Sequence, residues 1–457
     1  MPDFKAKGAP LACEVTRDNV YYLSETSKVR FPITPPPFTN HGNYVVSLSH
    51  VVKWMAGQVE AAGVDLFMGF AGQSVLFEGD RVVGVRTGDR GVGKHGQARG
   101  AIEPGADIRA KVTLFTDGVR GHLTKQLLRT LQLASAHPAQ YAIGLKELWD
   151  VPADRLAPGT VIHTLGYPLR QEEFGGSWIY AMPEGRLSVG FVVGLDYKDP
   201  LFDPHAAFQR FKLHPMVAAL LDGGQLVRFG AKALPEGGWN TQPRLYADGA
   251  LIAGDAANFV NSMRLKGIHL AMRSGMLAAE TAFGALREND TSARRLSAYK
   301  AAIDASAVRR ELHPVRNVHQ AFGGGLLAGS AFAGLTMATG GRWIGDLEGH
   351  AGHRQLRTLS DYYGLAKRDV LAGSNAVAAD RRLTFDKVTS VHYAGTHHEE
   401  NQPAHLLVQT DVCHSICGSE YGHPCVRFCP ANVYEMVDDG AGGRRLQLNA
   451  SNCVHCK

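Results

Sequence analysis

Hydrophobic and polar residues recur with two different periods along the chain. In residues 46–62 the large apolar side chains fall three or four positions apart, which predicts an amphipathic helix with one buried face. Residues 74–91 alternate around a central Gly-Asp pair, which predicts two strands joined by a turn. Residues 1–45 are polar and rich in proline, so we expect an irregular loop there.

Two short apolar runs end in a glycine and an aspartate. Residues 112–116 predict a buried strand followed by Asp-Gly, and residues 250–253 predict another followed by Gly-Asp. A long amphipathic helix is expected from about Gly267, and a further helix over 293–313. These strand–turn–helix successions are typical of a domain that binds a nucleotide at the end of its sheet.

The middle of the chain has a different pattern. Residues 140–245 mix strand-like runs with one helical piece around 206–221, which predicts a second, sheet-based domain. From about residue 380 the composition becomes polar and rich in histidine and cysteine, so a domain boundary is expected there.

Residues 321–340 form a stretch of 20 residues without a charge. That length could cross a bilayer, but six of the 20 are Gly, five are Ala and only six are large and apolar. Three interpretations stay open: a small-residue segment packed in the core, a shallow insertion into a membrane surface, or a true span.

Charge and cysteines narrow the class of protein. The net charge of +5, without any run of five basic residues, argues against a nucleic-acid partner. Six of the seven cysteines lie in the last 45 residues, and Cys13 stands alone. This distribution predicts a large reduced domain with a small metal-binding module, and the first residues do not have the pattern of a signal peptide.

The glycines at 91, 93 and 96 match G-x-G-x-x-G, but residues 97–108 contain Gly and Pro and cannot begin a helix. We expect a surface hairpin there.

The stronger nucleotide signal is ALIAGDAANFVN (250–261). Gly254 lets the backbone approach a ligand, and the Asp255 carboxylate can accept a hydrogen bond from a ligand hydroxyl. The helix that begins near Gly267 directs the positive end of its dipole at the same point. This pattern is typical of the C-terminal FAD motif of glutathione-reductase-like flavoproteins, and Asp117-Gly118 resembles their middle motif. An ordinary strand–helix turn is the alternative for both. These proteins also need an N-terminal dinucleotide fingerprint, which this sequence does not contain, so either the FAD interpretation is wrong or the beginning is missing.

The end of the chain carries the metal signal. Cys429 precedes a proline, and Cys453 and Cys456 form C-x-x-C. Such spacing is typical of an iron–sulfur cluster whose third cysteine would be residue 459, beyond the given sequence. Zinc is the alternative, held for example by Cys425, Cys429, Cys453 and Cys456, and unliganded thiols are the third possibility. Cys413, Cys417 and Cys425 remain unassigned.

Long segments spread along nearly the whole chain resemble the electron transfer flavoprotein–ubiquinone oxidoreductase family. They include the segments 40–55, 141–151, 166–180 (GYPLRQEEFGGSWIY), 189–200, 229–239, 265–280, 395–406, 428–437 and 452–457 (NCVHCK). The resemblance implies FAD, one 4Fe-4S cluster and a ubiquinone site, with electron transfer flavoprotein as the electron donor. It also implies a monotopic protein, with residues 322–346 at the membrane surface.

The resemblance also assigns residues. Cys429, Cys453 and Cys456 look like three of the four cluster ligands. Phe174, Gly175 and Gly176 match the family's quinone-site turn, where a bare glycine backbone can approach a quinone oxygen. No catalytic acid or base is assigned, because an electron relay does not require one.

The expected fold is α/β (α+β), with three units. An incomplete glutathione-reductase-like FAD domain (1–140 and 246–320) is interleaved with a ubiquinone-binding domain (141–245). A ferredoxin-like 4Fe-4S domain (380–457) comes last. We expect a fragment truncated at both ends, on the bacterial cytoplasmic membrane or, alternatively, the mitochondrial inner membrane. The alternative functions are an FAD-dependent reductase or hydroxylase with a zinc-binding tail, and an inactive fragment.

Overall fold

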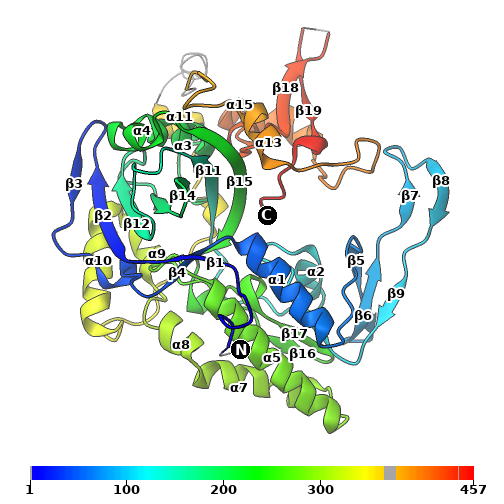
Figure 1. Ribbon diagram of the computed structural model, residues 1–457. Coiled ribbons are helices and arrows are strands. Elements are labelled where there is room, and N and C mark those ends of the chain that lie inside the picture. Colours follow the sequence, from blue (N-terminus) through cyan, green and yellow to red (C-terminus); the bar gives the residue numbers. More distant parts are fainter. Residues whose placement is uncertain (1–2, 365–376, 441) are drawn as a thin grey trace.

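The computed structural model describes residues 3–364, 377–440 and 442–457. Its largest element is a seven-stranded mixed sheet of order β15-β11-β14-β13-β12-β2-β3 (Figure 1). The strands are β2 (Arg17–Leu23), β3 (Lys28–Arg30), β11 (Tyr141–Asp150), β12 (Thr160–Gly166), β13 (Gly175–Ala181), β14 (Arg186–Gly194) and β15 (Gln225–Pro235). All neighbours are antiparallel except β12 and β2, which run parallel. This sheet confirms the expected sheet-based middle domain.

The expectation of an irregular loop over residues 1–45 is wrong. Strands β2 and β3 extend the large sheet, and β1 (Leu11–Glu14) pairs with β4 (Tyr44–Val46). The prolines that suggested a loop gather in and beside one 3-10 turn, η1 (Pro36–Phe38), whereas β2 is rich in the β-branched and aromatic residues that favour strands. Residues 17–30 therefore share a sheet with the middle domain rather than with the proposed FAD unit.

A smaller sheet of order β10-β17-β16 forms the second core. Its strands are β10 (Thr113–Phe115), β16 (Tyr246–Ala247) and β17 (Ala250–Ile252), and β10 and β17 are parallel. The predicted long helix is α5 (Ile268–Arg287), which buries Leu277 and Ala278 in this core. Tyr299 and Ile303 of α7 (Ala298–Ala305) pack into the same cluster.

Two predicted helices are interrupted in the structure. The piece at 206–221 is α3 (Pro204–Leu213) followed by α4 (Pro215–Leu221), because Pro215 has no N–H to continue the helical bonds. The helix at 293–313 is split into α6 (Ala293–Leu296), α7 and α8 (Ala307–Leu312). Ser306 ends α7 and caps α8, since its hydroxyl accepts the N–H of Val308 at 3.1 Å.

Other predicted elements are confirmed. The helix at 46–62 is α1 (Leu48–Ala61), and the strand–turn–strand at 74–91 is β5 (Gly72–Glu78) and β6 (Arg81–Thr87), with β9 (Asp107–Arg109) beside β6. The glycines that mimic a dinucleotide fingerprint lie in the hairpin β7 (Arg90–Val92) and β8 (Ala98–Glu103). The remaining helices before the tail are α2 (His122–Thr130), α9 (Val318–Ala321), α10 (Leu326–Thr339) and α11 (Leu359–Tyr363).

The cysteine-rich tail forms a small module above the β15 edge of the large sheet (Figure 1). Its elements are α13 (Lys387–Ala394), α14 (Thr410–Val412), η6 (Cys413–Cys417), α15 (Gly418–Tyr421), α16 (Cys425–Phe428), β18 (Tyr434–Asp438), β19 (Arg444–Leu448) and η7 (Ala450–Asn452). Helix α13 packs on β15, and α16 packs on α3.

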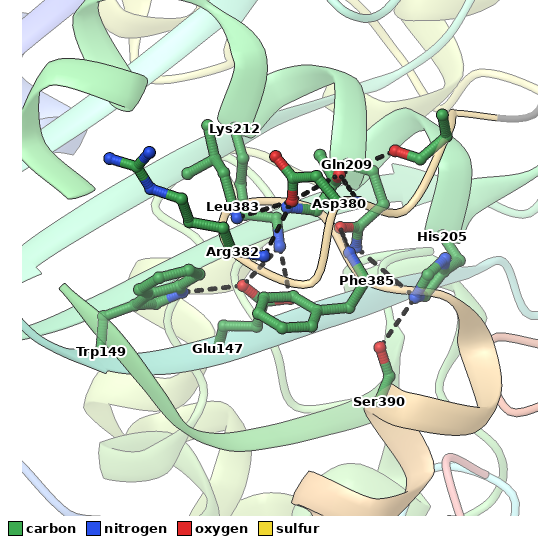
Figure 2. A network of polar contacts seen from close by, with 12 residues as sticks. Glu147, Trp149, His205, Gln209, Lys212, Asp380, Arg382, Leu383, Phe385 and Ser390 are labelled. Atoms are coloured by element: carbon green, nitrogen blue, oxygen red, sulfur yellow. Dashed lines mark hydrogen bonds and ion pairs between the residues drawn. The ribbon is translucent and has the colours of Figure 1, made fainter. Parts of the chain in front are cut away.

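A buried ion pair lies where the beginning of the tail meets the middle domain (Figure 2). Lys212 Nζ lies 2.9 Å from both carboxylate oxygens of Glu147, and both side chains are fully buried. Trp149 Nε1 donates to the same carboxylate at 2.8 Å. Phe385 packs with the Lys212 ammonium 4.9 Å from its ring, and its N–H donates to Gln209 Oε1 at 2.9 Å. The beginning of the tail is therefore fixed to the core of the middle domain.

Candidate functional site

The two Asp/Gly pairs singled out in the sequence lie at one edge of the small sheet. Phe115 of β10 is in register with Ile252 of β17, so the residues that follow both strands emerge side by side. Gly118 has φ +84° and Gly254 has φ +66°, a backbone conformation that glycine adopts without strain. The carboxyl ends of parallel strands are the usual place for a nucleotide ligand.

The carboxylate of Asp117 accepts hydrogen bonds from neighbouring residues of the same loop and helix. Its carboxylate accepts the N–H groups of Leu123 and Thr124, each at 3.1 Å, and the Thr124 hydroxyl. Gly121 makes this possible, because a Cβ there would lie 2.0 Å from the Asp117 carboxyl carbon. Asp117 thus caps α2 and shapes the loop that carries Gly118.

Asp255 stands beside the first turns of α5. The Gly254 N–H donates to Ser274 Oγ at 3.0 Å, which holds the 254–257 turn against the helix. Packing favours glycine at position 267, directly before α5, because a Cβ there would lie 2.8 Å from Val260 Cγ2. The N-cap residue therefore supplies no side-chain hydrogen bond to this helix end. Burial raises the pKa of Asp255, and the charge of Lys232 opposes the rise. An uncapped helix N-terminus beside a carboxylate suits a ligand with hydroxyl groups and a developing negative charge.

A cavity of about 220 Å³ joins the two glycine-bearing edges, since Gly118 and Ala256 both line it. Arg120 and Lys125 also line it and make it basic. Neither residue was predicted from the sequence, although both follow the Asp117-Gly118 motif closely. The glycines, the hydroxyl-accepting carboxylate and the basic cavity fit FAD, whose pyrophosphate is anionic.

A second cavity, of about 270 Å³, contains the predicted quinone residues. Phe174, Gly175 and Gly176 line it, and its walls are mostly apolar. The opposite wall comes from two further segments: the loop before and around η1, and α10. Their lining residues are Phe31, Pro35, Pro37 and Phe38 from the loop, and Leu326, Ser330, Ala333 and Met337 from α10. An enclosed apolar cavity of this kind suits a hydrophobic ring.

The two glycines lie in a strand, not in a turn as the family resemblance implied. They begin β13, between β12 and β14. A Cβ on Gly175 would stand 2.1 Å from the carbonyl oxygen of Val192, and one on Gly176 would stand 2.6 Å from that of Thr164. The packing of the sheet therefore requires glycine at both positions, besides any contact with a ligand.

Buried polar atoms face this apolar cavity. Among the described residues, His163 Nδ1, Thr164 Oγ1 and Ser177 Oγ have no hydrogen-bond partner, and all three residues line the cavity. Burial lowers the pKa of His163 to about 3, so its imidazole is neutral at physiological pH. Unsatisfied polar atoms in an apolar cavity fit a molecule with a few carbonyl or ether oxygens.

A row of three titratable side chains leads away from the cavity. Asp196 Oδ2 lies 3.0 Å from His319 Nε2, and His319 Nδ1 lies 3.6 Å from Glu236 Oε2. Burial lowers the pKa of His319, but its bonds to the two carboxylates outweigh burial and raise it to about 9. Burial raises the pKa of Glu236. Asp196 is about a quarter exposed, so the row connects the cavity with water.

The three predicted cluster cysteines lie together in the tail. Cys429 and Cys453 belong to one buried cluster, and Cys456 comes three residues later on the same loop. Burial raises the pKa of Cys456 to about 11, and the charges of Cys429 and Cys453 add to the rise, so the three sulfurs are within electrostatic reach. The His455 N–H donates to Cys453 Sγ at 3.4 Å. Backbone N–H groups of this kind commonly surround cluster thiolates, so the residues fit an iron–sulfur cluster.

The four cysteines expected as an alternative zinc site do not form the closest group of metal-binding atoms among the described residues. Among the described residues, the one set of three ligand atoms within 4.8 Å of one another is that of His405, Cys453 and His455. This set includes one cysteine of the four proposed for zinc.

The cluster loop meets the large sheet. Lys232 Nζ of β15 donates to the carbonyl oxygen of Lys457 at 3.0 Å, and the Ala233 N–H donates to that of Cys456. The charge of Lys232 also lowers the pKa of Asp255, and the charge of Lys457 lowers the pKa of Lys125. Glu236, which comes directly after β15, lines the apolar cavity. Residues 232–236 therefore contact the cluster loop and the apolar cavity, and the charge of Lys232 lowers the pKa of Asp255.

Two family descriptions match separate segments of the chain. The family description "ETF-QO, ubiquinone-binding" matches residues 141–234, and "Electron transfer flavoprotein-ubiquinone oxidoreductase, 4Fe-4S" matches residues 381–457. A geranylgeranyl bacteriochlorophyll reductase-like structure from Thermoplasma acidophilum is 20% identical, covers 73% of this chain and 77% of its own, and has a TM-score of 0.54. That likeness supports the mixed α/β fold alone.

Curated relatives show the family. The mitochondrial electron transfer flavoprotein-ubiquinone oxidoreductase of Homo sapiens is 40% identical, with 100% of this chain and 75% of the relative covered. The protein of the same name from Caenorhabditis elegans is 39% identical, with 100% and 77% covered. The chain therefore belongs to the electron transfer flavoprotein-ubiquinone oxidoreductase family.

Proposed function

We propose that this protein transfers electrons from reduced electron transfer flavoprotein to ubiquinone, through FAD and a 4Fe-4S cluster. The observation that carries the proposal is the meeting of the three sites along residues 232–236. Lys232 joins the cluster loop to the neighbourhood of Asp255, and Glu236 reaches the apolar cavity. An electron relay requires its redox groups to lie close together, and sites that share one strand would meet this requirement.

Each group has its own residues in this proposal. Gly118, Gly254, Asp255 and the helix start at Gly267 would hold FAD, with Asp117 shaping the loop. Cys429, Cys453 and Cys456 would hold the cluster. FAD can exchange electrons singly or in pairs, and a cluster exchanges them singly, so together they can link a flavoprotein donor to a quinone.

Reduction of a quinone to a quinol takes up protons as well as electrons. Glu236 is the carboxyl group that lines the cavity, and His319 lies directly behind it. A proton on His319 Nδ1 can pass to Glu236 Oε2, and Asp196 can resupply His319 from water. Phe174 packs edge-on against His319, with ring centroids 4.5 Å apart, and separates the imidazole from the apolar wall.

The finer proposal is that α10 lies on a membrane surface. No helix of the described residues is long and apolar enough to cross a bilayer. Helix α10 has 14 residues, so it is about 21 Å long, shorter than a hydrocarbon core of about 30 Å. Leu327 is 74% exposed and Leu335 44% exposed on the helix that walls the cavity. A quinone could therefore enter from lipid beside α10.

The host membrane is also proposed rather than shown. The relatives named above are mitochondrial proteins. We retain the bacterial cytoplasmic membrane for this protein, with the mitochondrial inner membrane as the alternative. The proposed division into three units is kept, except that residues 17–30 join the ubiquinone-binding unit.

The proposed function can be tested by a substitution that fills the apolar cavity with a large side chain. Ala333→Trp adds an indole to the cavity wall, whereas Ala331→Trp adds it to an exposed position on the same helix. With reduced electron transfer flavoprotein and a short-chain quinone, the wild type and Ala331→Trp should form quinol. Ala333→Trp should form little, although the donor still reduces its flavin. If Ala333→Trp turns over normally, the cavity is not the quinone site, and a wild type without quinol formation contradicts the function.

A second candidate is an FAD-dependent reductase or hydroxylase with a zinc-binding tail. The observation in its favour is the close set of His405, Cys453 and His455. Measurement of zinc, iron and acid-labile sulfide in the purified protein separates the two candidates, because zinc without sulfide would support the second.

A further inference from the structure

Three cysteines take no part in the proposed relay. Cys413, Cys417 and Cys425 lie at the beginning of the tail module, before the first proposed cluster ligand. Cys413 is buried, and Cys417 and Cys425 are half-buried. Three half-buried or buried thiols within 13 residues are unusual in a protein whose preceding 399 residues contain none.

Their spacing continues into the proposed cluster site. Cys413, Cys417, Cys425 and Cys429-Pro430 read C-x3-C-x7-C-x3-C-P. In bacterial ferredoxins three cysteines precede a fourth in x3-C-P, and in two-cluster ferredoxins this fourth cysteine binds the other cluster. Here Cys429, the cysteine of x3-C-P, is the one that lies in a buried cluster with Cys453. That assignment leaves the three earlier cysteines as the ligands of their own centre.

The fold brings the three thiols to one place. Residues 413–417 form a single wide turn, η6, a π-helical geometry that is frequent at functional sites. The chain then returns to this turn, because the His423 N–H donates to the Cys417 carbonyl at 3.4 Å and the His423 ring lies over Gly418. Cys425 begins α16 directly after the return.

A single zinc ion explains this group less well. Tetrahedral zinc would hold thiolates ~3.8 Å apart, given a Zn–S bond of about 2.3 Å. Among the described residues, no set that includes Cys413, Cys417 or Cys425 has three ligand atoms within 4.8 Å of one another. A cluster attaches its thiolates to different corners and so accepts a wider arrangement. All three thiols are free, so they are not joined in disulfides.

We propose that Cys413, Cys417 and Cys425 bind a second iron–sulfur cluster and supply three of its ligands. The inference rests on the proposed first cluster, since it assigns Cys429 to that centre. Cys425 and Cys429 stand four residues apart across α16, a rise of about 6 Å along the helix. The second cluster would therefore lie close to the first and extend the relay through the tail module.

The test compares serine variants of the full-length protein, purified without oxygen. The proposal predicts about eight iron and eight sulfide per chain in the wild type and about four in Cys417→Ser and Cys425→Ser. Cys453→Ser should lose the other cluster and change a different electron paramagnetic resonance signal. Cys13→Ser is the matched control, because Cys13 is distant in sequence and half-buried like Cys417.

Each outcome decides a different question. About four iron in the wild type, unchanged by Cys417→Ser, overturns the second cluster and leaves the first intact. Zinc in place of the second set of iron also overturns it. If Cys453→Ser changes no signal, the first cluster, and with it the proposed function, is assigned wrongly. Flavin content and circular dichroism of each variant confirm that it is folded.

Discussion

Gly176 shows how sequence and packing both constrain a single residue of the predicted quinone cavity. The FGG motif was recognised by resemblance, and its glycines do line the predicted cavity. A role in ligand contact alone does not account for them. The carbonyl of Thr164 behind Gly176 leaves no room for a Cβ, and that contact depends on strand pairing, which the sequence does not reveal.

The close contact between position 176 and the Thr164 carbonyl oxygen predicts that even an alanine at position 176 lowers the stability of the protein. Gly176→Ala should destabilise the protein by about 1–3 kcal/mol, because its Cβ would stand 2.6 Å from the Thr164 oxygen and the strands must separate. Gly230→Ala is the control, since Gly230 also lies within a strand and no atom lies within 4 Å of its Cβ position. Chemical denaturation measures both. Equal effects of the two substitutions would contradict the packing argument.

His319 permits a prediction about pH. Its pKa in the folded protein is about 9, against an ordinary value of 6.5, so the folded state binds the proton more tightly than the unfolded state. The stabilisation is complete below about pH 6.5 and is lost as the pH rises towards about 9. His319→Asn cannot contribute in this way. The difference in unfolding free energy between wild type and variant should therefore be largest at low pH and shrink through this range.

A difference that is constant or grows with pH would show that His319 is neutral in the folded protein. The row from Asp196 to Glu236 would then carry no positive charge on its central imidazole at physiological pH.

At the scale of helices and strands, one buried ion pair lies where the tail meets the core of the middle domain. Lys212→Met should cost about 3–5 kcal/mol, because it leaves the Glu147 carboxylate buried without a counter-charge. Glu147→Gln combined with Lys212→Met should recover part of the loss, since the Gln oxygen can still accept from Trp149. Denaturation curves of the single and double variants measure the recovery. A double variant less stable than Lys212→Met would contradict this account.

The same scale shows where the sequence was informative. The helix α5 and the strands β10 and β17 were predicted because each is a long or strongly apolar run that ends in a clear turn signal. The strand β2 was missed because its alternation is short and the prolines near residue 36 dominated the segment. The break at Pro215 comes from local chemistry and was available in the sequence.

At the scale of the whole molecule, the sequence predicted separate sites but not how they lie relative to one another. Asp255 and the C-x-x-C pair were predicted from local patterns and the FGG motif from a resemblance, and the three are far apart in the chain. Lys232 and Glu236 connect them, and neither belongs to a recognised motif. Their importance comes from the place of β15 at the edge of the large sheet, which only the three-dimensional structure provides.

The arrangement of α10 gives the last prediction. The helix closes the quinone cavity on one side and exposes apolar residues on the other, so its outer face should bind lipid while its inner face contacts the substrate. Leu327→Glu combined with Leu335→Glu places two charges on the outer face. The double variant should bind phospholipid vesicles more weakly and reduce long-chain quinone in vesicles more slowly. Reduction of a short-chain quinone in water should be unchanged, because neither residue lines the cavity.

Vesicle flotation and the two quinone assays separate the possible roles of this helix. Substitution of the exposed Val388 by Glu, on α13 of the tail module, controls for added charge away from α10. Equal losses with both quinones would mean that the charges distort the cavity rather than the membrane contact. Unchanged flotation would place the membrane surface elsewhere on the molecule. A loss confined to the long-chain quinone is the result that an apolar helix beside the cavity predicts, since only that substrate must come from lipid.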